Sequence, residues 1–174
     1  MLERILRDKR SGQTKIMRDT IELLKNINDA DKRIEICEII RSAHKAIAGL
    51  RWILKMLKDG KDPNKIEMEM EKADEICVER LRDLVRDGVV LTISRSHTLE
   101  RGLTSAKHVI VLESSPEKEG IDLMRYLKGR GISSSVFPDC AMAYAVKLCD
   151  IVVVGADCVL KDGFINKTGT LPFT

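Results

Sequence analysis

The first half of the chain carries apolar residues at the three- and four-residue spacing of amphipathic helices. This spacing predicts three helices, over residues 12–28, 31–58 and 63–86. Gly60 follows the second segment and offers a left-handed cap, and Pro63, where the third segment begins, prevents the second helix from continuing. We therefore expect residues 1–87 to form an antiparallel helical bundle.

The pattern changes at Asp87-Gly88, after which β-branched runs alternate with segments of helical period. The runs that predict strands are 89–93, 108–114, 133–137 and 151–157, and the helical segments between them are 96–107, 117–130 and 139–149. This alternation indicates parallel βαβ units, and nearly continuous apolar strands fit a sheet covered on both faces. We expect an α/β fold with two domains, an N-terminal helical bundle over 1–87 and a parallel sheet over 88–174.

The amino-acid composition argues against a disordered protein and against a nucleic-acid-binding protein. Hydrophobic residues make up 44% and charged residues 33% of the chain, which is typical of a folded protein rather than a disordered one. The net charge is only +3, and one Trp, two Tyr and three Phe supply few stacking groups, so nucleic acid is not an expected partner.

The N-terminus lacks the apolar core of a signal peptide, and no apolar run approaches the roughly 20 residues of a membrane span. We expect a cytoplasmic protein with no membrane partner, and the high content of Lys, Glu and Arg is typical of thermophiles.

The five cysteines form no CxxC pair, and none stands at metal-ligand spacing from a histidine. We therefore expect reduced cysteines, most of them buried, and neither a metal nor a cofactor.

Ligands of open parallel sheets bind beyond the carboxyl ends of the strands. This rule points to four places, residues 92–96, 113–120, 139 and 155–157. After the first predicted strand, Ser94, Arg95 and Ser96 precede a helix, where hydroxyls, a guanidinium and backbone N–H groups suit a phosphate. The alternative is that Ser94 or Ser96 only caps that helix.

Asp157 is the last residue of the fourth predicted strand. Its carboxylate is a candidate general acid or base, and the alternative is that it orders a turn by accepting backbone N–H bonds. The "KDG" sequence at 161–163 predicts a tight hairpin turn, which would return Asn166 and Lys167 beside Asp157. The Lys167 ammonium beside the Asp157 carboxylate would suit the binding of a sugar or a phosphate. The alternative is that the two groups form only an ion pair with each other.

Taken together, these segments resemble the regulatory alpha, beta and delta subunits of eukaryotic initiation factor 2B. That family includes the methylthioribose-1-phosphate isomerases and the archaeal ribose-1,5-bisphosphate isomerases. The motifs that carry the resemblance are "VVVGADCVLKDGFINKTGT", "LTISRSHTLERGL", "VLESSPEKEG", "RGISSSVFPDCAMAYAV" and, near the N-terminus, "DKRSGQTKI". The resemblance implies a helical domain followed by a Rossmann-like α/β domain, and assembly into homo- or hetero-oligomers.

In the isomerases of that family, a cysteine after the first strand and the aspartate of G-A-D form the catalytic pair, and the Asn-Lys pair helps to hold the substrate. By position these residues are Ser94, Asp157 and Asn166-Lys167 in this chain. A serine hydroxyl has a pKa far above the value of about 8.5 of a thiol, so it is a poor proton donor or acceptor near neutrality without an activating base. The sequence shows no such base.

Two further positions depart from the isomerases. Ser115 stands where relatives carry an arginine that binds phosphate. A serine at this position lacks the bidentate guanidinium donor of the arginine. Gln13 departs from an R-G-A motif, although Arg10 and Gly12 remain as candidate ligand-binding residues. Family members also continue well past N-K-x-G-T, whereas this chain ends at Thr174. We therefore expect a sheet that is incomplete at its C-terminal edge, in a fragment, a natural truncation or half of a split protein.

The leading hypothesis is an archaeal-type regulatory protein similar to initiation factor 2B and without catalysis. It would bind initiation factor 2 or a homologous subunit, and a sugar phosphate or nucleotide at a remnant pocket. The rival is an aldose-ketose isomerase of a ribose phosphate, in which Asp157 is the base and Arg95, Asn166 and Lys167 bind phosphate. A third possibility is a helical interaction module with a degenerate α/β domain.

Overall fold

The structure is a computed structural model that describes residues 1–8 and 11–166. These residues form two compact units, the first made of 1–73 with 156–165 and the second of 74–155 with Asn166. No helix in the described ranges is long and apolar enough to cross a membrane. The predicted domain boundary at residue 87 stays a prediction.

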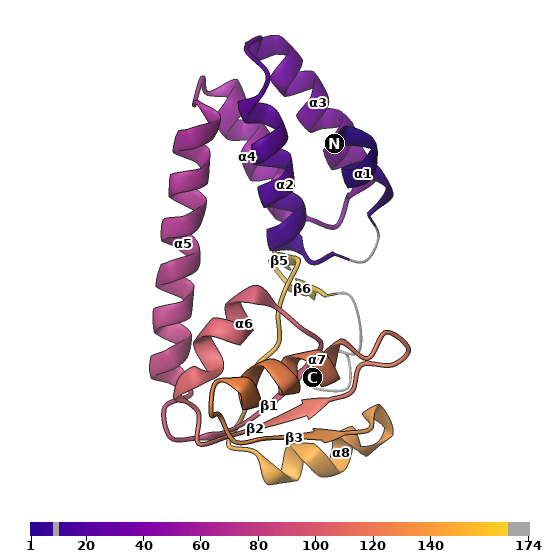
Figure 1. The fold of residues 1–174 in the computed structure, drawn as a ribbon, viewed down its shortest axis with the longest axis vertical. Coiled ribbons are helices and arrows are strands. Elements are labelled where there is room, and N and C mark those ends of the chain that lie inside the picture. The colour runs from indigo at the N-terminus through magenta and orange to yellow at the C-terminus, as the bar shows by residue number, and fades with distance from the viewer. Residues whose placement is uncertain (9–10, 167–174) are drawn as a thin grey trace. The chain divides into compact units, whose positions relative to one another are not determined.

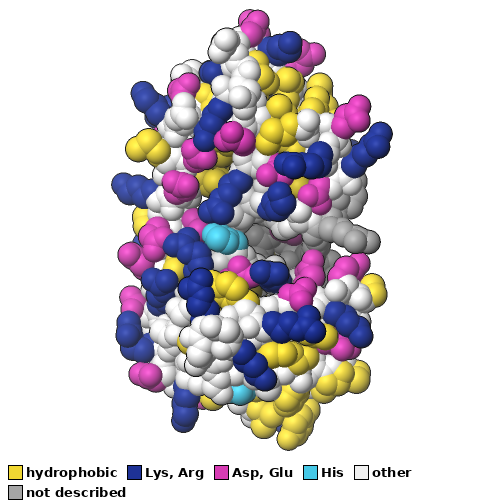
Figure 2. Space-filling model, in the orientation of Figure 1, with side chains coloured by type: hydrophobic (Ala, Val, Ile, Leu, Met, Phe, Trp, Pro, Cys, Tyr) yellow, Lys and Arg dark blue, Asp and Glu magenta, His cyan; other side chains and the backbone are white. Residues whose placement is uncertain are grey.

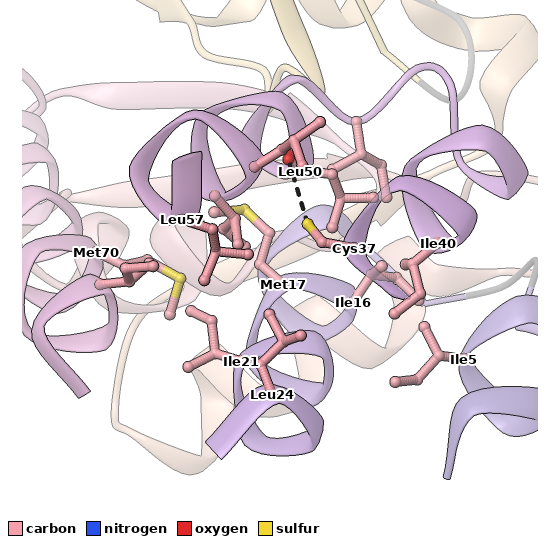
Figure 3. Packing of buried hydrophobic residues seen from close by; sticks show 14 residues of the cluster. Ile5, Ile16, Met17, Ile21, Leu24, Cys37, Ile40, Leu50, Leu57 and Met70 are labelled. Atoms are coloured by element: carbon pink, nitrogen blue, oxygen red, sulfur yellow. Dashed lines mark hydrogen bonds between the residues drawn. The ribbon is translucent and has the colours of Figure 1, made fainter. Parts of the chain in front are cut away.

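The first unit is built from helices packed around one apolar core (Figure 1). They are α1 (Leu2–Arg7), α2 (Gln13–Lys25), α3 (Ala30–Ala43), α4 (Ala48–Lys58) and the first half of α5 (Pro63–Leu84). The helices predicted over 12–28 and 63–86 are thereby confirmed. Figure 3 shows the buried side chains that α1 to α5 contribute to this core, among them Ile5, Ile21 and Met70.

The single helix predicted over 31–58 is wrong, because the chain breaks into α3 and α4 at residues 44–47. His44 Nε2 lies 2.7 Å from the carbonyl oxygen of Ile5, which fixes the break against α1. An unbroken helix of this length would extend about 42 Å, at about 1.5 Å per residue. Folding back at the break lets the apolar faces of both α3 and α4 enter the same core.

The expectation that most cysteines are buried is also wrong. Only Cys37 is buried, whereas Cys77 and Cys140 are exposed and Cys149 and Cys158 are partly buried. Burial raises the pKa of the Cys37 thiol to about 12, because a thiolate in the core would lose its hydration.

The raised pKa of Cys37 predicts an alkaline loss of stability. Below pH 9 the thiol is neutral in both states, whereas at higher pH it ionises first in the unfolded chain, whose pKa is 9.0. The free energy of unfolding should therefore fall by about 1.4 kcal/mol per pH unit between the two pKa values. Urea unfolding at several pH values should show a steeper loss of stability in the wild type than in Cys37→Ala, which retains only the smaller contribution of the Cys149 thiol, whose pKa burial also raises. Equal slopes in the two proteins would contradict the assignment.

The second unit contains a parallel sheet with strand order β3-β2-β1-β4. The strands are β1 (Val89–Ile93), β2 (His108–Leu112), β3 (Ser134–Phe137) and β4 (Ile151–Val152). Helices α6 (His97–Gly102) and α7 (Glu119–Gly129) cover one face, and α8 (Met142–Ala145) covers the other (Figure 1). The predicted α/β fold with a parallel sheet is confirmed.

Two elements of this unit differ most from the prediction. The fourth strand was expected over 151–157, but only Ile151–Val152 pair with β1, and the N–H of Val153 makes the last ladder bond, to Leu91. The helix predicted over 139–149 is divided, with α8 flanked by short 3-10 turns.

Figure 2 shows charged side chains of both signs interspersed on the viewed face, as the nearly balanced charge predicts.

Candidate functional site

The carboxyl ends of β1, β2 and β3 are joined by a short chain of hydrogen bonds. The N–H of Ser94, after β1, donates to Ser114 Oγ at 2.7 Å. The N–H groups of Ser114 and Ser115, after β2, donate to the two carboxylate oxygens of Asp139 at 2.9 and 2.7 Å. Three of the four places that the strand-end rule selected therefore contribute to one cluster in the second unit.

Ser94 makes the contact that sequence reasoning missed. Its hydroxyl donates to Glu119 Oε2 at 2.6 Å, a short charge-assisted hydrogen bond. Glu119 is the first residue of α7, and the sequence indicated only that acidic residues favour the first turn of a helix. The contact forms because α7 begins directly beside the end of β2, where the N–H of Gly120 donates to the carbonyl of Glu113.

The backbone at this edge is strained. Ser94, Ser114 and Lys118 have φ angles of 65°, 62° and 58°, in the left-handed region that residues other than glycine seldom adopt. Such conformations cost on the order of 1–3 kcal/mol each and collect at functional sites, where the surrounding structure holds them. Here the hydrogen bonds of Ser94 and Ser114 hold two of them.

The neighbouring residues Arg95 and Ser96 are also placed. The Arg95 guanidinium forms an ion pair with the largely buried carboxylate of Glu100. Ser96 occupies the N-cap position of α6 but makes no side-chain cap hydrogen bond, and the hydroxyl of Ser94 is committed to Glu119. The structure therefore does not support the alternative in which the hydroxyl of Ser94 or Ser96 caps α6.

Two other polar groups complete this edge. The Ser115 hydroxyl donates to Glu113 Oε1 at 2.9 Å. Thr92 is fully buried, and its hydroxyl has no hydrogen-bond partner among the residues that the structure describes.

Two of the remaining candidate residues, Gly12 and Asp157, belong to the first unit. The predicted hairpin is confirmed as β5 (Cys158–Leu160) and β6 (Gly163–Ile165), which pair antiparallel. The N–H of Asp157 donates to the carbonyl of Ile165 at 2.7 Å, and the carbonyl of Asp157 accepts from the N–H of Ala48 at 3.1 Å. Asp157 is therefore held by its backbone at the base of the hairpin.

Gly12 is the N-cap of α2, and a side chain added there would meet no atom of the described residues within 4 Å. Asn166 directly follows β6, whereas Arg10 and Lys167 lie outside the described residues. Because Ser94 and Asp157 belong to different units, their pairing stays a prediction. Within residues 1–8 and 11–166, no three His, Cys, Asp or Glu side chains gather as a metal site.

The family model described as "Initiation factor 2 subunit family" matches residues 9–173, which is nearly the whole sequence. The chain belongs to the initiation factor 2 subunit family. A translation initiation factor eIF-2B subunit 2-like protein of Pyrococcus horikoshii is 38% identical over 109 residues. A ribose 1,5-bisphosphate isomerase of Methanocaldococcus jannaschii is 29% identical over 159 residues, or 80% of the chain. The predicted family, with its two kinds of relative, is thus confirmed.

Solved structures of similar proteins agree with the fold. The translation initiation factor eIF-2B of Pyrococcus horikoshii OT3 is 28% identical, with a TM-score of 0.79 over 93% of this chain. The 5-methylthioribose 1-phosphate isomerase of the same organism is 18% identical, with a TM-score of 0.67 over 99% of this chain. Aligned residues of this chain cover 40% of the subunit 2-like relative and 52% of the ribose 1,5-bisphosphate isomerase, so both relatives are much longer.

Proposed function

We propose that this member of the family is a cytoplasmic regulatory protein that binds ligands and protein partners without catalysing isomerisation. The observation that carries the proposal is Ser94, which stands at the cysteine position of the isomerases and donates its proton to Glu119. Carboxylates in general are far too weakly basic to remove the proton of an alkyl hydroxyl. The Ser94–Glu119 pair therefore suits recognition of a ligand better than proton transfer.

The proposed partner is initiation factor 2 or a homologous subunit, in a homo- or hetero-oligomer. Support comes from the name of the 38% identical relative, an eIF-2B subunit 2-like protein. Members of the family form oligomeric complexes, as in the solved tetramer of eIF2B beta and delta subunits from C. thermophilum. The proposed small ligand is a sugar phosphate or nucleotide held beside Ser94.

Turnover assays test the absence of catalysis. Incubation with ribose 1,5-bisphosphate and with 5-methylthioribose 1-phosphate should give no product above background. Turnover at ordinary enzyme rates, on the order of 1–1000 per second, would overturn the proposal. Binding is tested separately by thermal shift, since a ligand at about 100 times its Kd stabilises the folded state by roughly 2.7 kcal/mol.

The second candidate is an isomerase of a ribose phosphate, which is favoured by the 29% identity to a ribose 1,5-bisphosphate isomerase over 80% of the chain. In it Asp157 is the base, and Arg95, Asn166 and Lys167 hold phosphate.

A matched pair of variants tests the role of Asp157 in that candidate. Asp157→Asn should lower the isomerase rate by about 100- to 10,000-fold, since it removes the base. Asp162→Asn, in the exposed turn of the same hairpin, makes the same chemical change and should leave the rate unchanged. Equal rates in both variants would exclude Asp157 as the base.

A further inference from the structure

Asp139 is held in place by its own segment of the chain. It follows β3, and Pro138 before it has a φ of −64°, the value that the proline ring imposes. The N–H of Ala141 donates to the carbonyl oxygen of Pro138 at 2.9 Å, which closes a 3-10 turn around the aspartate. The carbonyl oxygen of Phe137 accepts from the N–H of Glu113 at 2.9 Å, so the end of β3 is tied to the end of β2. The backbone of Asp139 is therefore fixed by a ladder bond and a turn.

The segments after β1 and β2 depend on partners instead. Ser94 and Ser114 both have left-handed backbones, which residues other than glycine keep only where the surrounding structure holds them. The consecutive N–H groups of Ser114 and Ser115 donate to the two oxygens of the Asp139 carboxylate, at 2.9 and 2.7 Å. Hydrogen bonds to an ionised acceptor are stronger than neutral ones. The Asp139 carboxylate therefore holds Ser114 in its strained conformation.

Ser114 passes this constraint on to Ser94. The Ser114 hydroxyl donates to the carbonyl oxygen of Leu112 at 3.2 Å, and its oxygen accepts from the N–H of Ser94 at 2.7 Å. Ser94 is only 8% exposed, so its N–H would be poorly hydrated if it lost this acceptor. If Ser114 relaxed to a right-handed backbone, its side chain would swing away from Ser94. The chain of contacts thus runs from Asp139 through Ser114 to the residue at the centre of the candidate site.

We propose that Asp139 is the positioning residue of the candidate site, because it sets the backbone of Ser94 through Ser114 and so aims the Ser94 hydroxyl. The inference rests on the proposed ligand-binding function and adds a residue that acts without touching the ligand. Side chains that bind a ligand must be held to within about 0.5 Å of the productive geometry, which requires such support. A carboxylate suits this role better than an amide, since an amide offers a single acceptor oxygen to the two N–H groups.

Amide hydrogen exchange tests the positioning without any ligand. In Asp139→Ala the N–H of Ser94 should exchange at least about tenfold faster than in the wild type, relative to amides in the middle of β1 and β2. Asp150→Ala is the matched control, because the Asp150 carboxylate accepts the N–H of Val89 at 2.8 Å at the amino end of the same sheet. It removes the same group at the opposite edge and should leave the exchange of Ser94 unchanged. Equal exchange of Ser94 in the two variants would overturn the assignment.

Titration calorimetry with ribose 5-phosphate measures the consequence for binding. Asp139→Ala should bind this probe about tenfold more weakly than the wild type does, whereas Asp150→Ala should stay within about twofold. Ser114→Ala removes only the oxygen through which Asp139 acts. The double variant of Asp139 and Ser114 should therefore bind no more weakly than the weaker single variant. Additive losses would mean that Asp139 contacts the ligand or acts by another route, and the positioning role would be wrong.

Asp139→Asn keeps the test decisive if Asp139→Ala fails to fold. It retains one acceptor oxygen, so the exchange of Ser94 should rise by a smaller factor of about three. Unchanged exchange in this variant would overturn the assignment. If the wild type did not bind ribose 5-phosphate, the proposed binding of a sugar phosphate would be wrong, and the exchange of Ser94 would still decide whether Asp139 positions that residue.

Discussion

Replacing Gly120 by alanine is expected to prevent the second unit from folding stably. A Cβ at this position would lie 1.8 Å from the carbonyl oxygen of Leu112 and 2.9 Å from its carbonyl carbon, both of them backbone atoms of β2. No rotamer change relieves such a clash, so the start of α7 would have to leave the sheet. That movement would uncover Leu123 and Leu127, which are fully buried. We expect a loss of at least about 4 kcal/mol, measured by urea unfolding.

The same substitution at Gly129 is the control. Gly129 ends the same helix and is exposed, and no atom of the residues that the structure describes lies within 4 Å of an added Cβ. Alanine there should be neutral or stabilise the protein by up to about 1 kcal/mol, because it lowers the entropy cost of the helix. If Gly120→Ala were as stable as Gly129→Ala, the close approach of α7 to β2 would be wrong, and with it the Ser94–Glu119 contact.

The sheet and the position of the candidate site were predictable because they depend on local patterns. β-branched runs marked β1, β2 and β3 to within two residues at either end. The carboxyl ends of parallel strands meet at one edge, so the segments that contain Ser94, Ser114 and Asp139 were expected to lie together. Hydrogen bonds among these three residues confirm that placement.

The missed features depend on contacts between elements. Apolar residues recur with the same spacing on both sides of the α3–α4 break, so the pattern did not indicate a break. The break is fixed by a contact of His44 with Ile5, which belongs to a different helix. The pairing of Ser94 with Glu119 depends on how closely α7 approaches β2, and the sequence shows only a glycine after an acidic residue at that point. The fourth strand is short because the backbone leaves the sheet after Val153, although the apolar run continues.

Replacing Ile40 by alanine should give the second large effect, in the first unit. Ile40 is completely buried in the core that also contains Ile5 and Ile16 (Figure 3), whereas the adjacent Ile39 is 43% exposed. Truncating a fully buried isoleucine removes apolar burial and leaves a cavity, which costs about 2–5 kcal/mol. A typical domain has only about 5–15 kcal/mol in total, so Ile40→Ala should lower the unfolding midpoint markedly.

Ile39→Ala removes the same atoms one position away and separates core packing from helix propensity. Both substitutions place alanine inside α3, so any gain in helix propensity is shared and cancels in the comparison. Ile39→Ala should cost less than about 1 kcal/mol, because much of that side chain is already in water. Urea unfolding of both variants measures the difference directly. Similar losses would mean that α3 turns a different face to the core, and the break at His44 would then no longer explain how α3 and α4 share it.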